Sequence, residues 1–320
     1  MRALSRQFPV TALAAALAIA CAACGSSSSP GNASTPAAAS SASGGTFPVT
    51  IAAANGTVHI PARPTAIISL APALTEMLYA VGAGRQVKAV DMYSDYPPQA
   101  PRTKLSGLAP NVEAIVAEKP DLVVESGDTG SLTKRLAAFH IPVLELPAPA
   151  GLPGVYSEFT ELGRATGHPA QAATEDASIR SQIAAIVAGL PHHGQPVSYY
   201  YELDPTYYSV TSDTFVGHLL GLLGMKSIAD AAKGAAAAGG YPQLSSEYIL
   251  RANPDYIVLA DTVCCHQSAA TVAKRPGWSG LTAVKQGHVI PLNDDVASRW
   301  GPRITVLLHT VATALARHGQ

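Results

Sequence analysis

One short pattern occurs twice in the chain, 134 positions apart, and it constrains the fold more than any other feature. In each copy a helical stretch begins near a glutamate, Glu113 or Glu247, and ends at a Pro-Asp pair that a short apolar run follows. Proline does not continue a helix, and a short apolar run bounded in this way is typical of a buried strand. The repeat therefore predicts two lobes of similar α/β build.

Length and charge agree with this interpretation and exclude some partners. The chain has 320 residues, 48% of them apolar and 13% charged, with a formal net charge of -1. This size suits two lobes of about 130 residues, each with a core of its own. A near-neutral charge offers no electrostatic basis for binding nucleic acid. We therefore expect no nucleic-acid partner.

The first residues indicate export. Arg2 and Arg6 precede an apolar stretch, residues 10–20, that is too short to span a bilayer, and small residues then lead to Cys24. This order resembles a bacterial lipoprotein signal, in which the cysteine carries acyl chains such as palmitate and anchors the chain outside the cytoplasm, at the cell membrane. Cys21 is an alternative lipidation site. An ordinary secretory signal with incidental cysteines is the alternative to both.

Composition sets the predicted domain boundaries. Residues 1–23 form the signal peptide, and residues 24–46, rich in Ser, Ala and Gly, form a flexible tether. Such a tether cannot bury enough surface to offset the entropy lost on ordering. Residues 47–154 form the N-terminal lobe, residues 155–192 a connecting helical segment and residues 193–320 the C-terminal lobe.

Strands that alternate with helices predict a mostly parallel sheet in each lobe, covered on both faces. A hairpin over residues 49–60, with its turn at Asn55-Gly56, should open the first lobe. Proline in a first turn predicts a helix that begins at Ala71-Pro72. The remaining expected strands are 66–70, 86–90, 122–125, 143–146, 197–203, 256–259 and 289–292.

The longest helical tract lies between the two lobes. It covers residues 155–166 and 169–190 and breaks near Gly167. Its position predicts a rigid connector, with an ordinary packed helix pair as the alternative. Further helices are expected to begin at Phe215, Ser246 and Arg303.

Six segments resemble, in order along the folded chain, the iron-siderophore and cobalamin class of ABC-transporter substrate-binding proteins. The segments begin at Ile68, Tyr93, Glu113, Gly240, Glu247 and Gly287. The resemblance implies an α/β fold of two Rossmann-like lobes joined by one long helix, with a ligand cleft between them. It also implies a monomer without a cofactor of its own, which captures a metal chelate and delivers it to a permease dimer that an ATPase drives.

Residues 93–100 and 298–304 most resemble the cobalamin-binding branch of this class. In that branch the residues at the positions of Tyr93 and Asp295 face the ligand. Leu108 and Ser126 stand where the branch has tryptophans, so the surface for stacking is smaller here. Cobalamin is therefore the favoured ligand, and a ferric siderophore or haem is the alternative.

The candidate ligand-binding residues supply aromatic surface or charge at the predicted cleft. Aromatic side chains combine a large contact area with a polar tip, which suits a bulky, partly apolar chelate. An arginine in the cleft would favour an anionic ferric siderophore. The candidates are Tyr93, Tyr96, Tyr207, Tyr208, Asp295, Arg299 and Trp300.

Glu113 and Glu247 resemble the two carboxylates with which this class docks onto arginines of its permease. Two separated contacts of this kind would fix the orientation of the complex. Each glutamate also lies just inside a predicted helix N-terminus, after Asn111 or Ser245. There a carboxylate stabilises the helix by about 0.3 to 1 kcal/mol. The two roles are compatible.

Cys264 and Cys265 are adjacent and follow a predicted strand of the second lobe. Outside the cytoplasm they can form a disulfide, since no other cysteine remains in the mature chain once Cys24 is lipidated. Two thiols without a role, or a soft metal site that includes His266, are the alternatives. The sequence contains no nucleophile elbow, phosphate-binding loop or zinc-protease motif, so no catalytic residue is expected. A secreted α/β hydrolase is the alternative from a different class.

Overall fold

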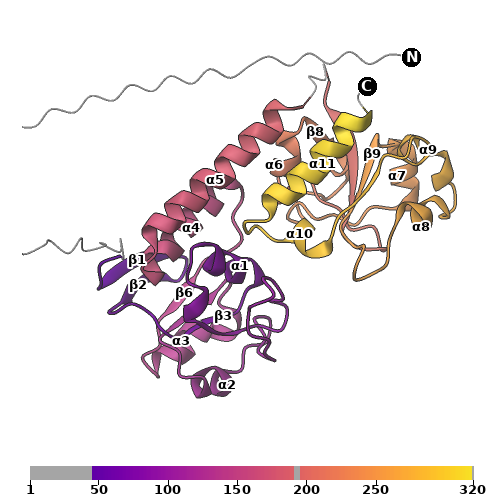
Figure 1. Cartoon of the computed structure of the whole chain (residues 1–320). Helices are drawn as coiled ribbons and strands as arrows, with labels where there is room; N and C mark the ends of the chain where they lie inside the picture. The colour runs from indigo at the N-terminus through magenta and orange to yellow at the C-terminus, as the bar shows by residue number, and fades with distance from the viewer. Residues whose placement is uncertain (1–44, 191–194, 319–320) are drawn as a thin grey trace, which may run out of the picture. The chain divides into compact units, whose positions relative to one another are not determined.

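The computed structural model describes residues 45–190 and 195–318 (Figure 1). The predicted signal peptide, both candidate lipidation sites and most of the predicted tether lie outside the described residues. Within the described ranges, no helix combines the length and the apolar character needed to cross a bilayer.

Two four-stranded sheets share one topology. The strands are β3 (Ile67–Ser69), β4 (Val87–Val90), β5 (Leu122–Glu125), β6 (Val143–Glu145), β7 (Val197–Glu202), β8 (Met225–Ser227), β9 (Tyr256–Leu259) and β10 (Val289–Pro291). Their orders are β4-β3-β5-β6 and β8-β7-β9-β10, and all pairs in both sheets are parallel. In each lobe the second strand in the chain lies at one edge of the sheet, beside the first strand. The third and fourth strands follow on the other side of the first strand. The predicted pair of similar α/β lobes is confirmed.

The repeated aspartate has the same structural role in both lobes. Asp121 accepts hydrogen bonds from the backbone N–H groups of Thr65 (2.7 Å) and Ala66 (3.0 Å), just before β3. Asp255 accepts from the backbone N–H (2.9 Å) and the hydroxyl (2.6 Å) of Ser198, at the start of β7. Each aspartate therefore ties the third strand of its lobe to the first strand.

A hairpin precedes the first sheet, as the sequence predicts. It consists of β1 (Val49–Ala53) and β2 (Gly56–Ile60), and Ala53 pairs with Gly56. The turn residues are therefore Ala54 and Asn55, one position earlier than predicted. Gly56 has a φ of 107°, which favours glycine, and the Asn55 side chain donates to the carbonyl of Val143 (2.9 Å). That contact ties the turn to the first lobe.

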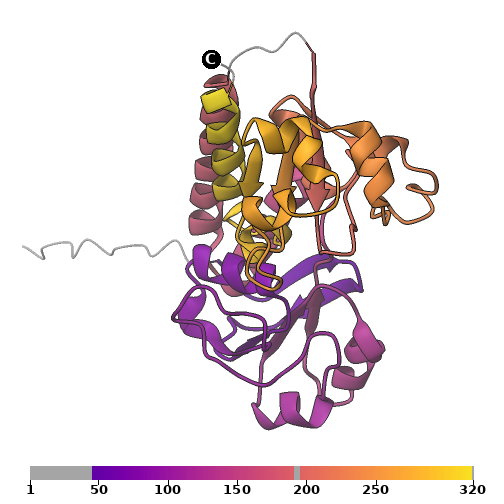
Figure 2. The ribbon, with the colours of Figure 1, turned by 90° about the vertical axis from the view of Figure 1, so that its right-hand side faces the viewer.

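Helices cover the sheets (Figures 1 and 2). The helices outside the connection are α1 (Pro72–Ala80), α2 (Val112–Ala117), α3 (Leu132–Ala137), α6 (Phe215–Leu222), α7 (Ser246–Ala252), α8 (Ala269–Ala273), α9 (Thr282–Lys285), α10 (Asp294–Ser298) and α11 (Ile304–His318). The sequence analysis missed α3, α8, α9, α10 and strand β8. Each has six residues or fewer, which is too short for a clear periodic pattern.

Two successive helices connect the lobes. They are α4 (Leu152–Thr166) and the 20-residue α5 (Pro169–Ala188). Gly167, with a φ of 79°, ends α4 in the left-handed conformation that glycine favours. The long helix that the resemblance implies is therefore α5. Helix α4 packs against β1 and α1, whereas α5 lies beside α11 (Figure 2).

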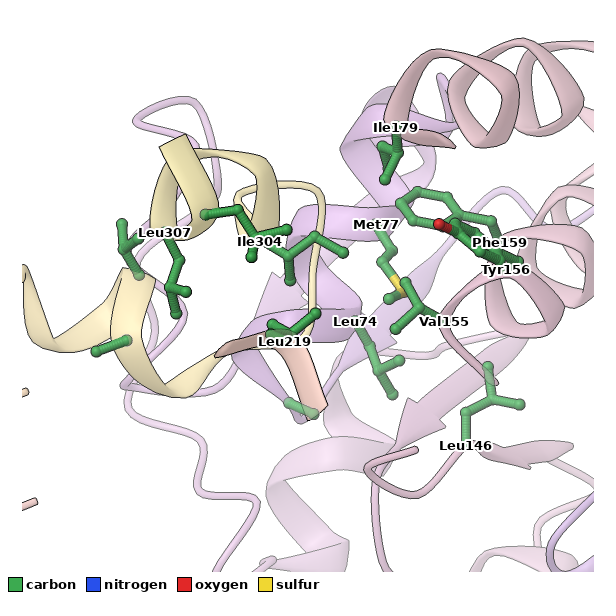
Figure 3. Close-up of a cluster of buried hydrophobic side chains, with 14 of the residues drawn as sticks. Leu74, Met77, Leu146, Val155, Tyr156, Phe159, Ile179, Leu219, Ile304 and Leu307 are labelled. Carbon is green, nitrogen blue, oxygen red and sulfur yellow. The ribbon is translucent and has the colours of Figure 1, made fainter. Parts of the chain in front are cut away.

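One apolar core joins these helices. Figure 3 shows side chains from α1, α4, α5 and α11 packed together, and each side chain named below is at most 1% exposed. Burying a side chain of this size contributes about 1.5 to 3 kcal/mol. The residues are Leu74, Met77, Val155, Phe159, Ile179, Ile304 and Leu307. Helix α1 belongs to the first lobe and α11 to the second, so apolar packing attaches both lobes to the connecting helices.

Candidate functional site

Large exposed side chains gather in the loops that follow the parallel strands. Parallel α/β sheets bind ligands at the carboxyl ends of their strands, and exposed apolar surface marks a candidate binding face. In the first lobe these side chains belong to the loops after β4, and in the second lobe to the loops after β7 and β9 and to the segment before α7. They are Met92, Tyr93, Tyr96, Leu108, Tyr208, Tyr241 and Val263, each between 40% and 75% exposed. We call these loops the carboxyl-end face.

A pocket of about 280 Å³ opens at this face in the first lobe. Its lining comes from the loops after β3, β4 and β5 and includes Tyr93, one of the predicted ligand residues. Leu108 and Ser126, the two positions where the resemblance implies a reduced stacking surface, line the same pocket. The structure therefore brings these three positions together.

Two buried acids also line this pocket. Asp91 is 3% exposed and Glu125 is 2% exposed. Burial raises the pKa of Glu125 to about 8, and the nearby charges of Asp128 and Glu145 act in the same direction. Burial also raises the pKa of Asp91, although hydrogen bonds from Ser94 and Tyr93 oppose the shift. The pocket is thus acidic, and one of its acids holds a proton at neutral pH.

Arg299 binds three carboxylates and one carbonyl. Its Nη1 donates to Glu76 (3.0 Å) and Asp95 (2.9 Å). Its Nη2 donates to Asp295 (2.5 Å) and to the backbone carbonyl of Tyr93 (3.0 Å). The predicted residues Tyr93, Asp295 and Arg299 therefore lie together. Both terminal nitrogens of the guanidinium are therefore already bound to groups of the protein.

Glu76, which the sequence analysis did not single out, is the centre of this ion cluster. Its side chain is fully buried and also accepts two hydrogen bonds from Arg303, at 2.9 and 2.6 Å. Glu76 belongs to α1 of the first lobe, whereas Arg299 and Arg303 flank the start of α11. The cluster therefore joins the two lobes. Because its charges are paired, removal of one partner would leave a buried charge uncompensated.

Tyr96 and Trp300 are also tied to internal partners. The Arg303 guanidinium lies 4.3 Å from the centroid of the Tyr96 ring, within cation–π distance. The indole N–H of Trp300 donates to Glu158 of α4 at 2.8 Å. Burial raises the pKa of Glu158 to about 8, although this hydrogen bond opposes the shift. Trp300 packs against the apolar core, so only part of its surface faces outward.

Tyr207 and Tyr208 differ in their surroundings. Tyr208 is 41% exposed on the carboxyl-end face. Tyr207 is only partly exposed and stacks on the buried Trp278, with ring centroids 5.6 Å apart. Arg275 packs over the Trp278 ring and forms a two-point ion pair with the buried Glu202, at 2.5 and 2.6 Å. Tyr207 therefore contributes mainly to packing in the second lobe.

Glu113 and Glu247 lie in equivalent places, in the first turns of α2 and α7, and both are exposed. The side chains of Asn111 and Ser245 cap the two helices and accept from the backbone N–H three residues ahead, at 3.0 and 3.2 Å. A backbone hydrogen bond at the helix start and the Ser245 hydroxyl lower the pKa of Glu247. Both carboxylates are thus available on the surface.

Cys264 and Cys265 form a disulfide in the structure. Asp294 holds their loop, since its carboxylate accepts from the backbone N–H groups of Val263 (2.8 Å) and Cys264 (2.7 Å). Within the described residues, no cluster of three or more His, Cys, Asp or Glu side chains has the arrangement of a metal site.

Sequence reasoning missed several members of the face. Tyr241 lies in the segment that begins at Gly240, which supports the resemblance, but it was not named as a ligand candidate. Met92, Glu125 and Val263 stand at or just after strand ends. A search of the last residue of each expected strand would have found Glu125, whereas Met92 and Val263 lie in the loops beyond β4 and β9.

The comparisons with known proteins agree with this geometry. The chain matches the family model described as periplasmic binding protein over residues 67–296. It is 34% identical over 268 residues to the uncharacterized ABC transporter substrate-binding lipoprotein YvrC of Bacillus subtilis, covering 81% of this chain and 82% of the relative. It is 31% identical over 279 residues to a cobalamin-binding protein of Halobacterium salinarum, covering 84% of this chain and 74% of the relative.

A solved structure supports the same assignment. The periplasmic vitamin B12 binding protein BtuF of Vibrio cholerae matches with a TM-score of 0.67 and 25% identity, covering 80% of this chain and 98% of that one. The family match runs from β3 into α10 and thus includes both sheets. Members of this family are transport proteins rather than enzymes, and those of ABC transporters work with a membrane permease and an ATPase. The chain therefore belongs to the periplasmic binding protein family and is a substrate-binding protein of the ABC-transporter type.

Proposed function

We propose that the chain captures a corrinoid such as cobalamin outside the cytoplasm and delivers it to an ABC importer. The observation that carries this proposal is the carboxyl-end face, which has exposed aromatic and apolar side chains in both lobes and a small acidic pocket in the first lobe. A corrin ring offers a broad, partly apolar surface for such a face and carries primary amides at its edge. The names of the relatives from Halobacterium salinarum and Vibrio cholerae support the same ligand class.

The charges at this face favour a neutral chelate over an anionic one. Arg299 already contacts Glu76, Asp95 and Asp295, so it offers no unpaired positive charge. A haem or a catecholate siderophore would bring carboxylates or phenolates close to acids. A ferric siderophore remains the alternative ligand, because Leu108 and Ser126 offer less stacking surface than the tryptophans of the cobalamin-binding branch.

We further propose that the chain is a lipoprotein anchored through Cys24. The order of basic, apolar and small residues before this cysteine supports the anchor, and Cys21 is the alternative site. Replacing Cys24 by alanine should abolish incorporation of radiolabelled palmitate and release the protein into the medium. If labelling persists in Cys24→Ala and disappears in Cys21→Ala, the anchor is Cys21.

Glu113 and Glu247 are proposed as the docking carboxylates. Their equivalent, exposed positions at the starts of α2 and α7 support this role. A Glu113→Arg, Glu247→Arg variant should abolish uptake of labelled cyanocobalamin in cells and keep the affinity of the purified protein within about two-fold. Partly exposed Glu118 provides a matched control, since Glu118→Arg reverses a charge away from both helix starts. Uptake that survives the double reversal would contradict the docking role.

Tryptophan fluorescence tests the ligand itself. The purified full chain, kept in detergent, is titrated in parallel with cyanocobalamin, ferrioxamine B, a ferric catecholate and haem, with controls for absorbance by each ligand. Trp278 and Trp300 supply the signal. Saturable binding of cyanocobalamin at micromolar or lower concentration supports the proposal. Binding of a ferric chelate or haem alone would refute the corrinoid and keep the transport role.

A further inference from the structure

The acidic pocket of the first lobe combines apolar walls with a buried acid. Its walls are apolar, formed in part by Leu70, Pro72 and Leu108, and it encloses about 280 Å³. Glu125 belongs to this lining at the end of β5, and the whole residue is only 2% exposed. The pocket is therefore a small apolar cavity with an acid inside it.

One oxygen of this acid lacks a partner. Among the described residues, Glu125 Oε1 has no hydrogen-bond partner and is shielded from solvent, although the Thr133 hydroxyl interacts with the same carboxyl group and lowers its pKa. A buried polar atom without a hydrogen bond costs roughly 1 to 3 kcal/mol in a folded protein, and a donor from a ligand would offset that cost. Glu125 thus resembles an acceptor kept for a ligand.

The charges around the pocket select the sign of that ligand. Among the residues that the structure describes, no lysine, arginine or histidine lines the pocket. Asp91 lines it beside Glu125, and Asp128 and Glu145 add negative charge nearby. Such surroundings repel a carboxylate or a phenolate and attract an N–H donor that is neutral or positively charged.

Two of the side chains that line the pocket are smaller than tryptophan. Leu108 and Ser126 stand where the resemblance to the cobalamin-binding branch implies tryptophans, and both line this cavity. An indole at either position would occupy space that is open here. The same two substitutions that reduce the stacking surface therefore leave room for a polar group of the ligand to reach Glu125.

We propose that this pocket is a specificity subsite that receives an N–H donor group of the bound chelate, a primary amide or an ammonium group, with Glu125 as its acceptor. The inference rests on the proposed function, because the ligand must lie on the carboxyl-end face. A corrinoid would supply the donor from an amide at the ring edge. A cationic ferric hydroxamate would supply it from an ammonium group.

Isothermal titration of cyanocobalamin and of ferrioxamine B, which carries an ammonium group, tests the subsite. Glu125→Leu should lower the affinity for the bound ligand by about ten-fold. Glu125→Gln keeps an acceptor, so it should lower the affinity for a ligand that donates from an amide by three-fold or less. Glu118→Gln is the matched control, since Glu118 is an acid of the same lobe that pairs with Lys88 and does not line the pocket. That variant should bind within two-fold of the unmodified protein.

Two measurements identify the donor. An ammonium group should displace the proton of Glu125 on binding near pH 7, so the apparent enthalpy will vary with the ionisation enthalpy of the buffer. An amide should bind without releasing a proton. Among cobalamin monocarboxylates, each with one amide hydrolysed, one isomer should bind at least ten-fold more weakly to the unmodified protein, and this loss should largely disappear in Glu125→Leu.

The possible outcomes distinguish a failure of the subsite from a failure of the proposed function. Equal affinities for the unmodified protein and Glu125→Leu, with cyanocobalamin bound, would overturn the subsite and leave the proposed function standing. Binding of ferrioxamine B alone, with a Glu125-dependent loss, would support the subsite and refute the corrinoid. Failure to bind either chelate would overturn both.

Discussion

The two lobes share a framework, but one buried acid of the second lobe, Glu202, and one of the first, Glu125, differ in their partners. In the second lobe Glu202, at the end of β7, has a fully buried side chain in a two-point ion pair with Arg275. In the first lobe Glu125, at the end of β5, is equally buried and leaves Oε1 without a partner. Both acids lie at the carboxyl end of a central strand.

This difference separates structural acids from a candidate binding acid. A paired buried carboxylate fixes the packing around it, because its partner cannot leave without exposing a charge to an apolar interior. A carboxyl oxygen without a partner adds no hydrogen bond to the empty protein and is free to accept one from a ligand. Glu76, whose side chain is buried and which is held by Arg299 and Arg303, belongs with Glu202 on the structural side.

Removal of the partner of Glu202 should have the largest effect on stability. Arg275→Met leaves the Glu202 carboxylate buried without its cation and should lower the free energy of unfolding by about 3 to 5 kcal/mol. Urea unfolding measures this loss. The double variant Arg275→Met, Glu202→Gln removes both charges and should recover much of it. A loss below about 1 kcal/mol in the single variant would show that the pair is not structural.

The ion cluster between the lobes should give the next largest effect. Arg303→Met removes two of the three hydrogen bonds that Glu76 accepts, while Arg299 remains, so the expected loss is about 2 kcal/mol. The matched control is Lys88→Met. Lys88 pairs with Glu118 at 3.7 Å on the surface, each side chain 44% exposed, and its loss should cost less than about 0.5 kcal/mol. Similar losses in the two variants would refute the structural role of Glu76.

The raised pKa of Glu125 should make the free energy of unfolding depend on pH. Glu125 keeps its proton in the folded protein up to about pH 8, whereas its ordinary pKa is 4.5. Between these values the unfolded chain binds fewer protons, so its contribution to stability falls as the pH rises. Glu125→Leu removes that contribution.

The free energy of unfolding of Glu125→Leu, relative to the unmodified protein, should therefore increase by about 2 kcal/mol between pH 5 and pH 7. Urea unfolding at three pH values measures this change. Glu158, whose pKa burial also raises to about 8, is untouched in the variant, so a residual decline with pH is expected. A difference that stays constant across this range would mean that Glu125 is ionised when folded.

The disulfide should have the smallest effect. Adjacent cysteines close almost no loop, so their bond restricts the unfolded chain very little. Cys264→Ser, Cys265→Ser should therefore change the free energy of unfolding by less than about 0.5 kcal/mol. Asp294→Ala, which removes two backbone hydrogen bonds from the same loop, should cost more, about 1 kcal/mol. The opposite order would assign the loop's rigidity to the disulfide.

The fold was largely predictable because its signals are local. The strand over residues 122–125, the helix that begins at Pro72 and the repeated Pro-Asp pair each depend on neighbouring residues alone. The missed elements lack such local signals. Strand β8, for example, has only three residues, which are too few to show an alternating pattern. Its place beside β7 depends on pairing with a distant strand.

The site was predictable only in part. Resemblance placed Tyr93, Asp295 and Arg299 at the predicted cleft, and the structure brings them together. The ion pair between Arg299 and Glu76 spans 223 positions, so no local pattern could predict it. The missing partner of Glu125 is likewise a property of packing in three dimensions. Neither the composition of β5 nor its length distinguishes that glutamate from a paired one.

A crystal structure of the full chain with cyanocobalamin tests the central claim most directly. The account predicts that the corrin ring lies on the carboxyl-end face against Tyr93 and Leu108, with one of its amide groups inside the pocket and within hydrogen-bond distance of Glu125 Oε1. A corrin bound elsewhere, or a pocket that the bound ligand does not enter, would contradict it.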